Sequence, residues 1–113
     1  MEMEVTELDG KAIKIALLGR LDTPGVDQIE TRFSASIVPG GHQAIVDLSG
    51  VSFIASMGLR MFITVARSAS KRGGKLVLLS PQAMVNEVFT NAALSDIIPV
   101  VFSVEEALGQ LNG

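Results

Sequence analysis

The chain has 113 residues, 48% of them hydrophobic and 19% charged, which is the composition of one globular domain over residues 1–113. It contains no cysteine, so disulfides, thiolate metal sites and cysteine nucleophiles are excluded. Nine Lys and Arg against twelve Asp and Glu give a net charge of −3, and Trp and Tyr are absent, so we expect no nucleic-acid binding. The acidic N-terminal residues are not followed by the apolar segment of a signal peptide, and no apolar stretch is long enough to cross a membrane. We therefore expect a cytoplasmic protein without membrane insertion.

The first half of the chain predicts a hairpin, a helix and a buried strand. Apolar and polar residues alternate on both sides of Asp9-Gly10, a dipeptide typical of two-residue type I′ turns, which predicts an antiparallel hairpin within the first 20 residues. Thr23 is expected to cap a helix that begins at Pro24 and carries one apolar stripe, formed by Val26, Ile29, Phe33 and Ile37. After Pro39-Gly40-Gly41 ends this helix, residues 44–48 are expected to form a strand that is covered on both faces.

A second helix is expected from Ser56 to about Arg72, where Gly73-Gly74 ends it. Its inward stripe is predicted to consist of Leu59, Phe62, Ile63, Ala66 and Ala69. Beside that stripe lies a second row of apolar residues, spaced four residues apart. This row either completes the core or forms an adaptable docking patch for a partner: Met57, Met61 and Val65. The polar face is basic, and either is simply solvated or attracts an acidic rim on a partner: Arg60, Thr64, Arg67 and Lys71.

The rest of the chain predicts two more strands and two more helices. Residues 76–79 form a buried strand, and Pro81 opens a helix whose inward residues are expected to be Val85, Val88, Phe89 and Ala92. Residues 97–101 are expected to form an edge strand because they include Pro99, and Ser103–Glu106 is a capping box for a helix that ends at Leu111. The order ββαβαβαβα predicts a single α/β domain with a mixed sheet, in which an N-terminal antiparallel hairpin joins parallel strands and about four helices.

No residue pattern predicts catalysis. His42 is the only histidine, and it is expected to be exposed in a glycine-rich loop. Ser56 follows a predicted strand, but it lacks the preceding glycine and the later histidine of a serine hydrolase. Gly73-Gly74-Lys75 lacks the spacing of a phosphate-binding loop, and the acidic residues do not cluster as metal ligands. We therefore expect no enzyme activity, no catalytic residue, no metal and no cofactor, and a nucleotide-binding domain is the least favoured alternative.

Ser56 has two possible roles, one structural and one functional. A loop is expected to carry the chain from Leu48 to Ser56 at the start of the second helix, and binding residues of parallel α/β sheets gather in such loops. The serine either caps the helix or receives a modification, because a helix N-terminus favours a negative charge. A phosphate there would add about −1.5 to −2 charge units.

The segment around Ser56 resembles the signature of STAS domains, in particular the bacterial anti-sigma factor antagonists. The matching residues are Asp47-Leu48-Ser49-Gly50-Val51, then Phe53-Ile54, then Ser56-Met57-Gly58-Leu59. The resemblance extends over nearly the whole chain, with the remaining features in the expected order: the hairpin, Gly19-Arg20-Leu21-Asp22, Gly73-Gly74, and Val101-Phe102-Ser103 followed by Glu105-Glu106-Ala107-Leu108.

The resemblance implies a partner-switching protein. The unphosphorylated antagonist binds an anti-sigma factor that is also a serine kinase, and thereby frees a sigma factor. The kinase phosphorylates a serine, here Ser56, which ejects the antagonist until a serine phosphatase resets it. Asp22, Thr23 and Ser49 are expected in neighbouring loops that shape the docking surface. The expected partner-binding residues are therefore Asp22, Thr23, Ser49, Ser56, Met57, Gly58, Arg60 and Met61.

The chain departs from the family pattern on both sides of this serine. Many antagonists have Asp before it and Ser or Thr after it, where this chain has Ala55 and Met57. These departures favour an alternative in which the domain is never phosphorylated and acts as a scaffold subunit of a signalling or lipid-transport complex. In the first interpretation, Asp22 is expected to supply the missing nearby carboxylate. Both interpretations leave a homodimer open.

Overall fold

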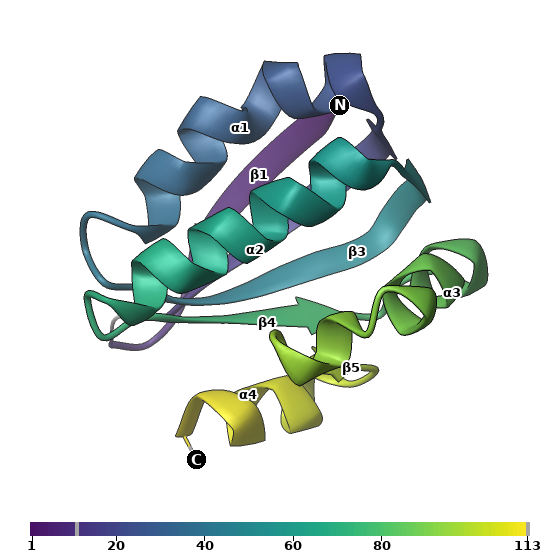
Figure 1. Cartoon of the computed structure of the whole chain (residues 1–113). Coiled ribbons are helices and arrows are strands. Elements are labelled where there is room, and N and C mark those ends of the chain that lie inside the picture. Colours follow the sequence, from purple (N-terminus) through teal and green to yellow (C-terminus); the bar gives the residue numbers. More distant parts are fainter. Residues whose placement is uncertain (11, 113) are drawn as a thin grey trace.

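Five strands form one mixed sheet in the computed structural model, which describes residues 1–10 and 12–112 (Figure 1). The strands are β1 (Glu2–Glu7), β2 (Ala12–Leu21), β3 (Gln43–Ile54), β4 (Lys75–Leu79) and β5 (Val100–Val101). The helices are α1 (Thr23–Ile37), α2 (Ser56–Ser70), α3 (Ala83–Asn91) and α4 (Val104–Asn112), and a short 3₁₀ turn, η1 (Leu94–Asp96), precedes β5. This is the predicted order ββαβαβαβα.

The strands lie in the sheet in the same order as in the chain, from β1 to β5. β1 pairs antiparallel with β2, and β2, β3, β4 and β5 run parallel to one another. The carboxyl ends of these four strands therefore lie along one edge of the sheet. Because α1, α2 and α3 each follow one of the first three parallel strands, their N-termini lie along this carboxyl edge.

Helices cover both faces of the sheet, and each face has its own apolar core. α1, α2 and α3 pack on one face, where the rings of Phe33, Phe62 and Phe89 form a row with edge-to-face contacts at 5.8 Å and 6.4 Å between centroids. Phe62 thus places α2 between α1 and α3. On the other face, α4 buries Ala107 and Leu111 against Ile45, Val77, Leu79 and Val101.

β3 is much longer than predicted. The apolar run predicts an end at Leu48, but β3 continues to Ile54, and β2 pairs with it along this extension. The register shifts between Ala16 and Leu18 and again between Gly19 and Arg20, which marks two bulges that keep the strands paired. The expected loop before Ser56 is therefore strand, and only Ala55 separates β3 from α2.

Several local predictions need correction. The Leu8 amide donates to the Ala12 carbonyl at 2.9 Å, so the hairpin connection is longer than a two-residue turn. α2 buries Met61 and Val65, whereas the predicted inward residues Leu59, Ile63 and Ala66 are only half-buried. Ala92 follows the end of α3 and is exposed. The last strand is limited to Val100–Val101, because the amides of Ile97 and Ile98 both donate to the Leu94 carbonyl at 2.9 Å and so continue the turn that follows η1.

The C-terminal helix begins as predicted. The Ser103 hydroxyl accepts from the Glu106 amide at 3.1 Å and donates to the Glu106 carboxylate at 3.2 Å. This arrangement satisfies one of the free amides in the first turn of α4.

Candidate functional site

Asp22 and Ser56 lie at the ends of neighbouring strands. Leu21, the last residue of β2, pairs with Ile54, the last residue of β3. Beyond this pair the Ala55 amide donates to the Leu21 carbonyl at 2.9 Å, which joins the two chain segments as they leave the sheet. The starts of α1 and α2 therefore lie next to each other at the carboxyl edge.

Ser56 is the first residue of α2 and is exposed. The N-cap residue is Ala55, whose backbone is extended, and no side chain caps the helix. The interpretation of Ser56 as the capping residue is therefore wrong. The first turn of α2 also contains no acidic residue, so the positive end of the helix dipole is not neutralised by a neighbouring carboxylate on this turn.

Asp22 is the N-cap of α1, and not Thr23 as the sequence predicts. The Asp22 Oδ1 atom accepts from the Gly25 amide at 2.9 Å, and Thr23 is instead an exposed residue of the first turn. The Gly25 N–H holds the pKa of the Asp22 carboxyl below its usual value, and the Arg20 guanidinium, whose Nε lies 3.3 Å from Oδ2, acts in the same direction. Asp22 therefore carries its negative charge at neutral pH.

Arg20 and Phe53 belong to the same edge, although neither is among the partner-binding residues expected from the sequence. The Arg20 guanidinium lies 4.4 Å from the centre of the Phe53 ring while it also contacts Asp22. Arg20 and Phe53 face each other because a bulge sets their pairing between β2 and β3. No spacing within the sequence reveals such a cross-strand register.

Gly58 allows the start of α2 to lie close to the strand ends. A methyl group at Gly58 would lie 2.8 Å from the Ile54 Cγ1 atom and 3.2 Å from the Leu21 Cβ atom, and Gly58 is buried. Its place in the site is thus to let the helix approach the sheet.

The expected methionine patch is divided between surface and core. Met61 is 2% exposed and Val65 is 3% exposed, so both complete the core, whereas Met57 is half-buried and Arg60 is exposed. A depression of about 160 Å³ lies between α1 and α2, lined by Glu30, Ser34, Met57, Arg60, Met61, Thr64 and Val65. Of the two methionines, Met57 is therefore the one that is better placed to contact a partner.

Ser49 does not lie in a loop beside Ser56, as was expected. It is exposed within β3, five residues before Ile54, which places it about 16 Å from the end of the strand. Its backbone amide donates to the Asp47 carboxylate at 3.0 Å, and its carbonyl accepts from the side-chain Nε2 of Gln82 at 2.8 Å.

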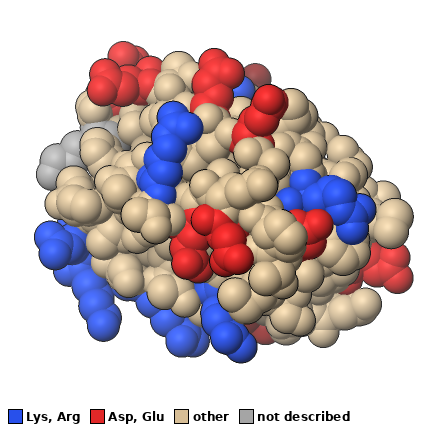
Figure 2. All heavy atoms as spheres, turned by 90° about the horizontal axis from the view of Figure 1, so that it is seen from above, with Lys and Arg blue, Asp and Glu red and all other residues tan. Residues whose placement is uncertain are grey.

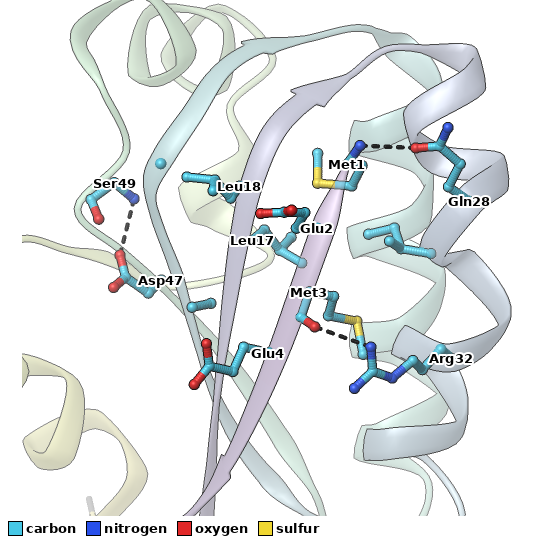
Figure 3. A pocket seen from close by; sticks show the side chains of 13 residues that line it. Met1, Glu2, Met3, Glu4, Leu17, Leu18, Gln28, Arg32, Asp47 and Ser49 are labelled. Carbon is cyan, nitrogen blue, oxygen red and sulfur yellow. Dashed lines mark hydrogen bonds between the residues drawn. The ribbon is translucent and has the colours of Figure 1, made fainter.

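Ser49 instead lines a separate hollow of about 680 Å³, which is bordered by the start of β1, the middle of β2, the neighbouring part of β3 and one side of α1 (Figure 3). In Figure 3, Glu2, Glu4 and Asp47 lie on one side of this hollow, and the Arg32 guanidinium donates to the Met3 carbonyl at 3.0 Å on the other. Its acidic side chains do not make a metal site: among the described residues, no group of three or more His, Asp or Glu could hold a metal ion.

Two further predictions concern features away from this edge. His42 is half-buried directly before β3, rather than exposed. No helix within residues 1–10 and 12–112 is long and apolar enough to span a membrane.

Comparison with known proteins identifies the family. The family model described as STAS domain matches residues 2–107. The chain belongs to the STAS domain family.

Curated relatives of this STAS domain cover its full length. It is 30% identical over 114 residues to the anti-sigma F factor antagonist of Lysinibacillus sphaericus, covering 100% of this chain and 97% of the relative. It is 27% identical over 113 residues to the anti-sigma-B factor antagonist of Listeria monocytogenes, covering 100% and 96%. The solved structure of the anti-sigma factor antagonist SpoIIAA in its unphosphorylated form superposes with a TM-score of 0.80, at 26% identity and coverage of 99% and 97%.

The STAS signature segment of this chain, residues 47–59, comprises the second half of β3 and the start of α2. Its two ends therefore differ in position: Asp47 and Ser49 line the hollow on the sheet, whereas Ser56 lies at the carboxyl edge.

Proposed function

We propose that this STAS domain is an anti-sigma factor antagonist that is controlled by phosphorylation of Ser56. The unphosphorylated form binds an anti-sigma factor that is also a serine kinase, and a sigma factor is released. The kinase phosphorylates Ser56 and the complex dissociates, until a serine phosphatase removes the phosphate. The domain acts in the cytoplasm by binding and not by catalysis. The observation that carries this proposal is the exposed Ser56 at the uncapped start of α2.

Because of the position of Ser56, a phosphate there would weaken the binding of a partner more than the stability of the fold. The free amides and the positive dipole end of α2 favour an anion at this point, so the folded domain tolerates the added charge. A partner that covers the neutral hydroxyl would have to desolvate about −1.5 to −2 charge units, which costs several kcal/mol. Phosphorylation therefore switches binding without unfolding the domain.

The docking surface that we propose consists of side chains exposed or half-buried around Ser56. They come from the starts of two helices: Asp22, Thr23, Met57 and Arg60. Gly58 is buried beneath this surface, where it lets α2 lie close to the strand ends. Met61 lies in the core, and Ser49 lies in the middle of β3, away from Ser56. Asp22 provides the carboxylate next to Ser56 that Ala55 lacks, and the cap bond to Gly25 holds this carboxylate in place.

The test compares three baits for affinity capture from the source cells: the wild type, Ser56→Ala and Ser56→Glu. We expect a serine-kinase anti-sigma factor with the wild type and with Ser56→Ala, a weakened complex with Ser56→Glu, and phosphate on Ser56 of the wild type by mass spectrometry. Ser70, which is exposed at the other end of α2, provides the matched controls Ser70→Ala and Ser70→Glu. Neither control is expected to change capture or phosphorylation.

A second function is favoured by the departures at Ala55 and Met57. If all baits capture the same assembly without a kinase, and Ser56 carries no phosphate, the domain is a scaffold subunit of a signalling or lipid-transport complex. Full phosphorylation of Ser56→Ala by the captured kinase would instead show that Ser56 is not the modified residue.

A further inference from the structure

Basic residues are concentrated in one part of this acidic chain. Five of its nine Lys and Arg residues fall between Asp47 and Glu87, and no Asp or Glu occurs between these two positions. The remaining chain carries four basic residues and all twelve acidic ones. Figure 2 shows one face of the molecule, where several Lys and Arg side chains gather along the lower and lower-left margins, whereas Asp and Glu side chains lie along the upper margin, in the centre and on the right.

Most of these basic residues lie on one line along α2. Arg60, Thr64, Arg67 and Lys71 follow one another at intervals of four, three and four residues, so they form one row on the helix surface, and all four are exposed. We call this row the basic strip. It extends over about 17 Å. Ser56 lies four residues before Arg60 and is therefore the first position of the same row.

Within residues 1–10 and 12–112, no ion pair involves the basic strip. The ion pairs among the described residues are Lys14–Asp47 and Arg20–Asp22, and neither includes a residue of the strip. Glu30 of α1 shares the depression with Arg60, but no acidic residue occurs on α2 itself. Half-buried apolar side chains flank the row, Met57 on one side and Ile63 on the other.

We propose that the basic strip binds a protein surface that presents a row of Asp and Glu side chains, with Ser56 at one end of this interface. Charge complementarity is the basis for the chemistry of the partner. A protein is favoured over a nucleic acid or an anionic membrane because the chain as a whole carries a net charge of −3. In addition, apolar side chains flank the strip, which a folded partner can cover, and its own residues include no aromatic ring for base stacking.

The basic strip gives the modification of Ser56 a second effect, and this part rests on the proposed function. A phosphate on Ser56 would place about two negative charges at the end of a row that otherwise attracts carboxylates. The same partner surface that the strip attracts would then meet a like charge four residues from Arg60.

The experiment uses the full chain labelled with ¹⁵N and, as the probe, a peptide of about ten glutamates, which is long enough when extended to span the strip. We expect the peptide to shift the amide resonances of residues 60–72 at about 50 mM salt, and the binding to weaken strongly near 300 mM. Arg67→Glu is expected to weaken binding about fivefold, and Arg67→Glu together with Lys71→Glu about tenfold or more. The matched control is Lys14→Glu on β2, which is expected to change binding less than twofold, with folding checked by circular dichroism.

Three results would overturn the proposal. One is a set of shifts spread over all basic residues, and another is equal weakening by Arg67→Glu and Lys14→Glu. The third is tighter binding of the strip to a single-stranded DNA or to phosphatidylglycerol vesicles than to the peptide at equal charge concentration. The titration needs neither a kinase nor phosphorylation. Absence of phosphate on Ser56 would therefore refute the proposed function, but it would not affect the proposal that the basic strip binds an acidic surface.

Discussion

Replacing Gly58 by alanine tests whether the start of α2 lies against the strand ends as described. The added methyl group would approach Ile54 Cγ1 to 2.8 Å, Ile54 Cδ1 to 3.1 Å and Leu21 Cβ to 3.2 Å, and both contacted residues are buried. Such overpacking costs about 1–3 kcal/mol, while alanine gains up to about 1 kcal/mol over glycine within a helix. We therefore expect Gly58→Ala to lower the free energy of unfolding by about 1 kcal/mol.

Gly109 provides the matched control, because it lies within α4 and a methyl group there would have no heavy atom within 4 Å. Gly109→Ala is expected to raise the free energy of unfolding by about 0.5–1 kcal/mol. Urea unfolding followed by far-UV circular dichroism measures both variants, since the chain has no Trp or Tyr for fluorescence. Equal stabilisation by the two substitutions would refute the close approach of α2 to Ile54 and Leu21.

Three further substitutions test the core, the caps and the pH response. Phe62→Ala removes the middle ring of the aromatic row and should cost about 3–5 kcal/mol in urea unfolding, so a loss below about 1 kcal/mol would contradict the packing of α2 between α1 and α3. Ser103→Ala removes the cap of α4 and should cost about 1 kcal/mol in the same assay, and no loss would mean that the cap contributes nothing. The Asp22 pKa is lowered in the folded state, so its stabilising effect is present above the unfolded pKa of about 3.9 and is lost as the pH falls through the lower folded value. Asp22→Asn keeps an oxygen for the Gly25 amide but does not titrate, and its stability should therefore fall less than that of the wild type between about pH 5 and pH 2; parallel curves would exclude this role.

The element order could be predicted from the sequence because local patterns encode it. The apolar stripe of α1 is buried as expected, with Val26, Ile29, Phe33 and Ile37 all in the core. The length of β3 could not be predicted, since Ser49, Gly50 and Ser52 interrupt the apolar run. Pairing with β2 through two bulges holds this segment in the sheet, and such pairing depends on residues about thirty positions away.

The buried face of α2 was misplaced for a related reason. α2 packs between two helices and against the sheet, so it carries apolar residues on both sides of its buried face. One set lies on the side toward α1: Met57, Met61 and Val65. The other set lies on the opposite side of the helix: Leu59, Ile63 and Ala66. Periodicity alone does not distinguish the more deeply buried flank. Ser56 could be located at the helix start from its sequence context, whereas its freedom from a capping role followed only from the backbone at Ala55.

The strand order has a consequence for the kind of ligand that this edge can accept. Nucleotide-binding α/β sheets open a crevice where the strand order reverses, because the helices on either side of that point leave the sheet toward opposite faces. Here the described strands never reverse: β2, β3, β4 and β5 follow in order, and α1, α2 and α3 all turn to one face. The helix starts consequently form one continuous rim instead of two diverging walls. A rim of this shape suits the broad surface of another protein better than the narrow phosphates of a nucleotide.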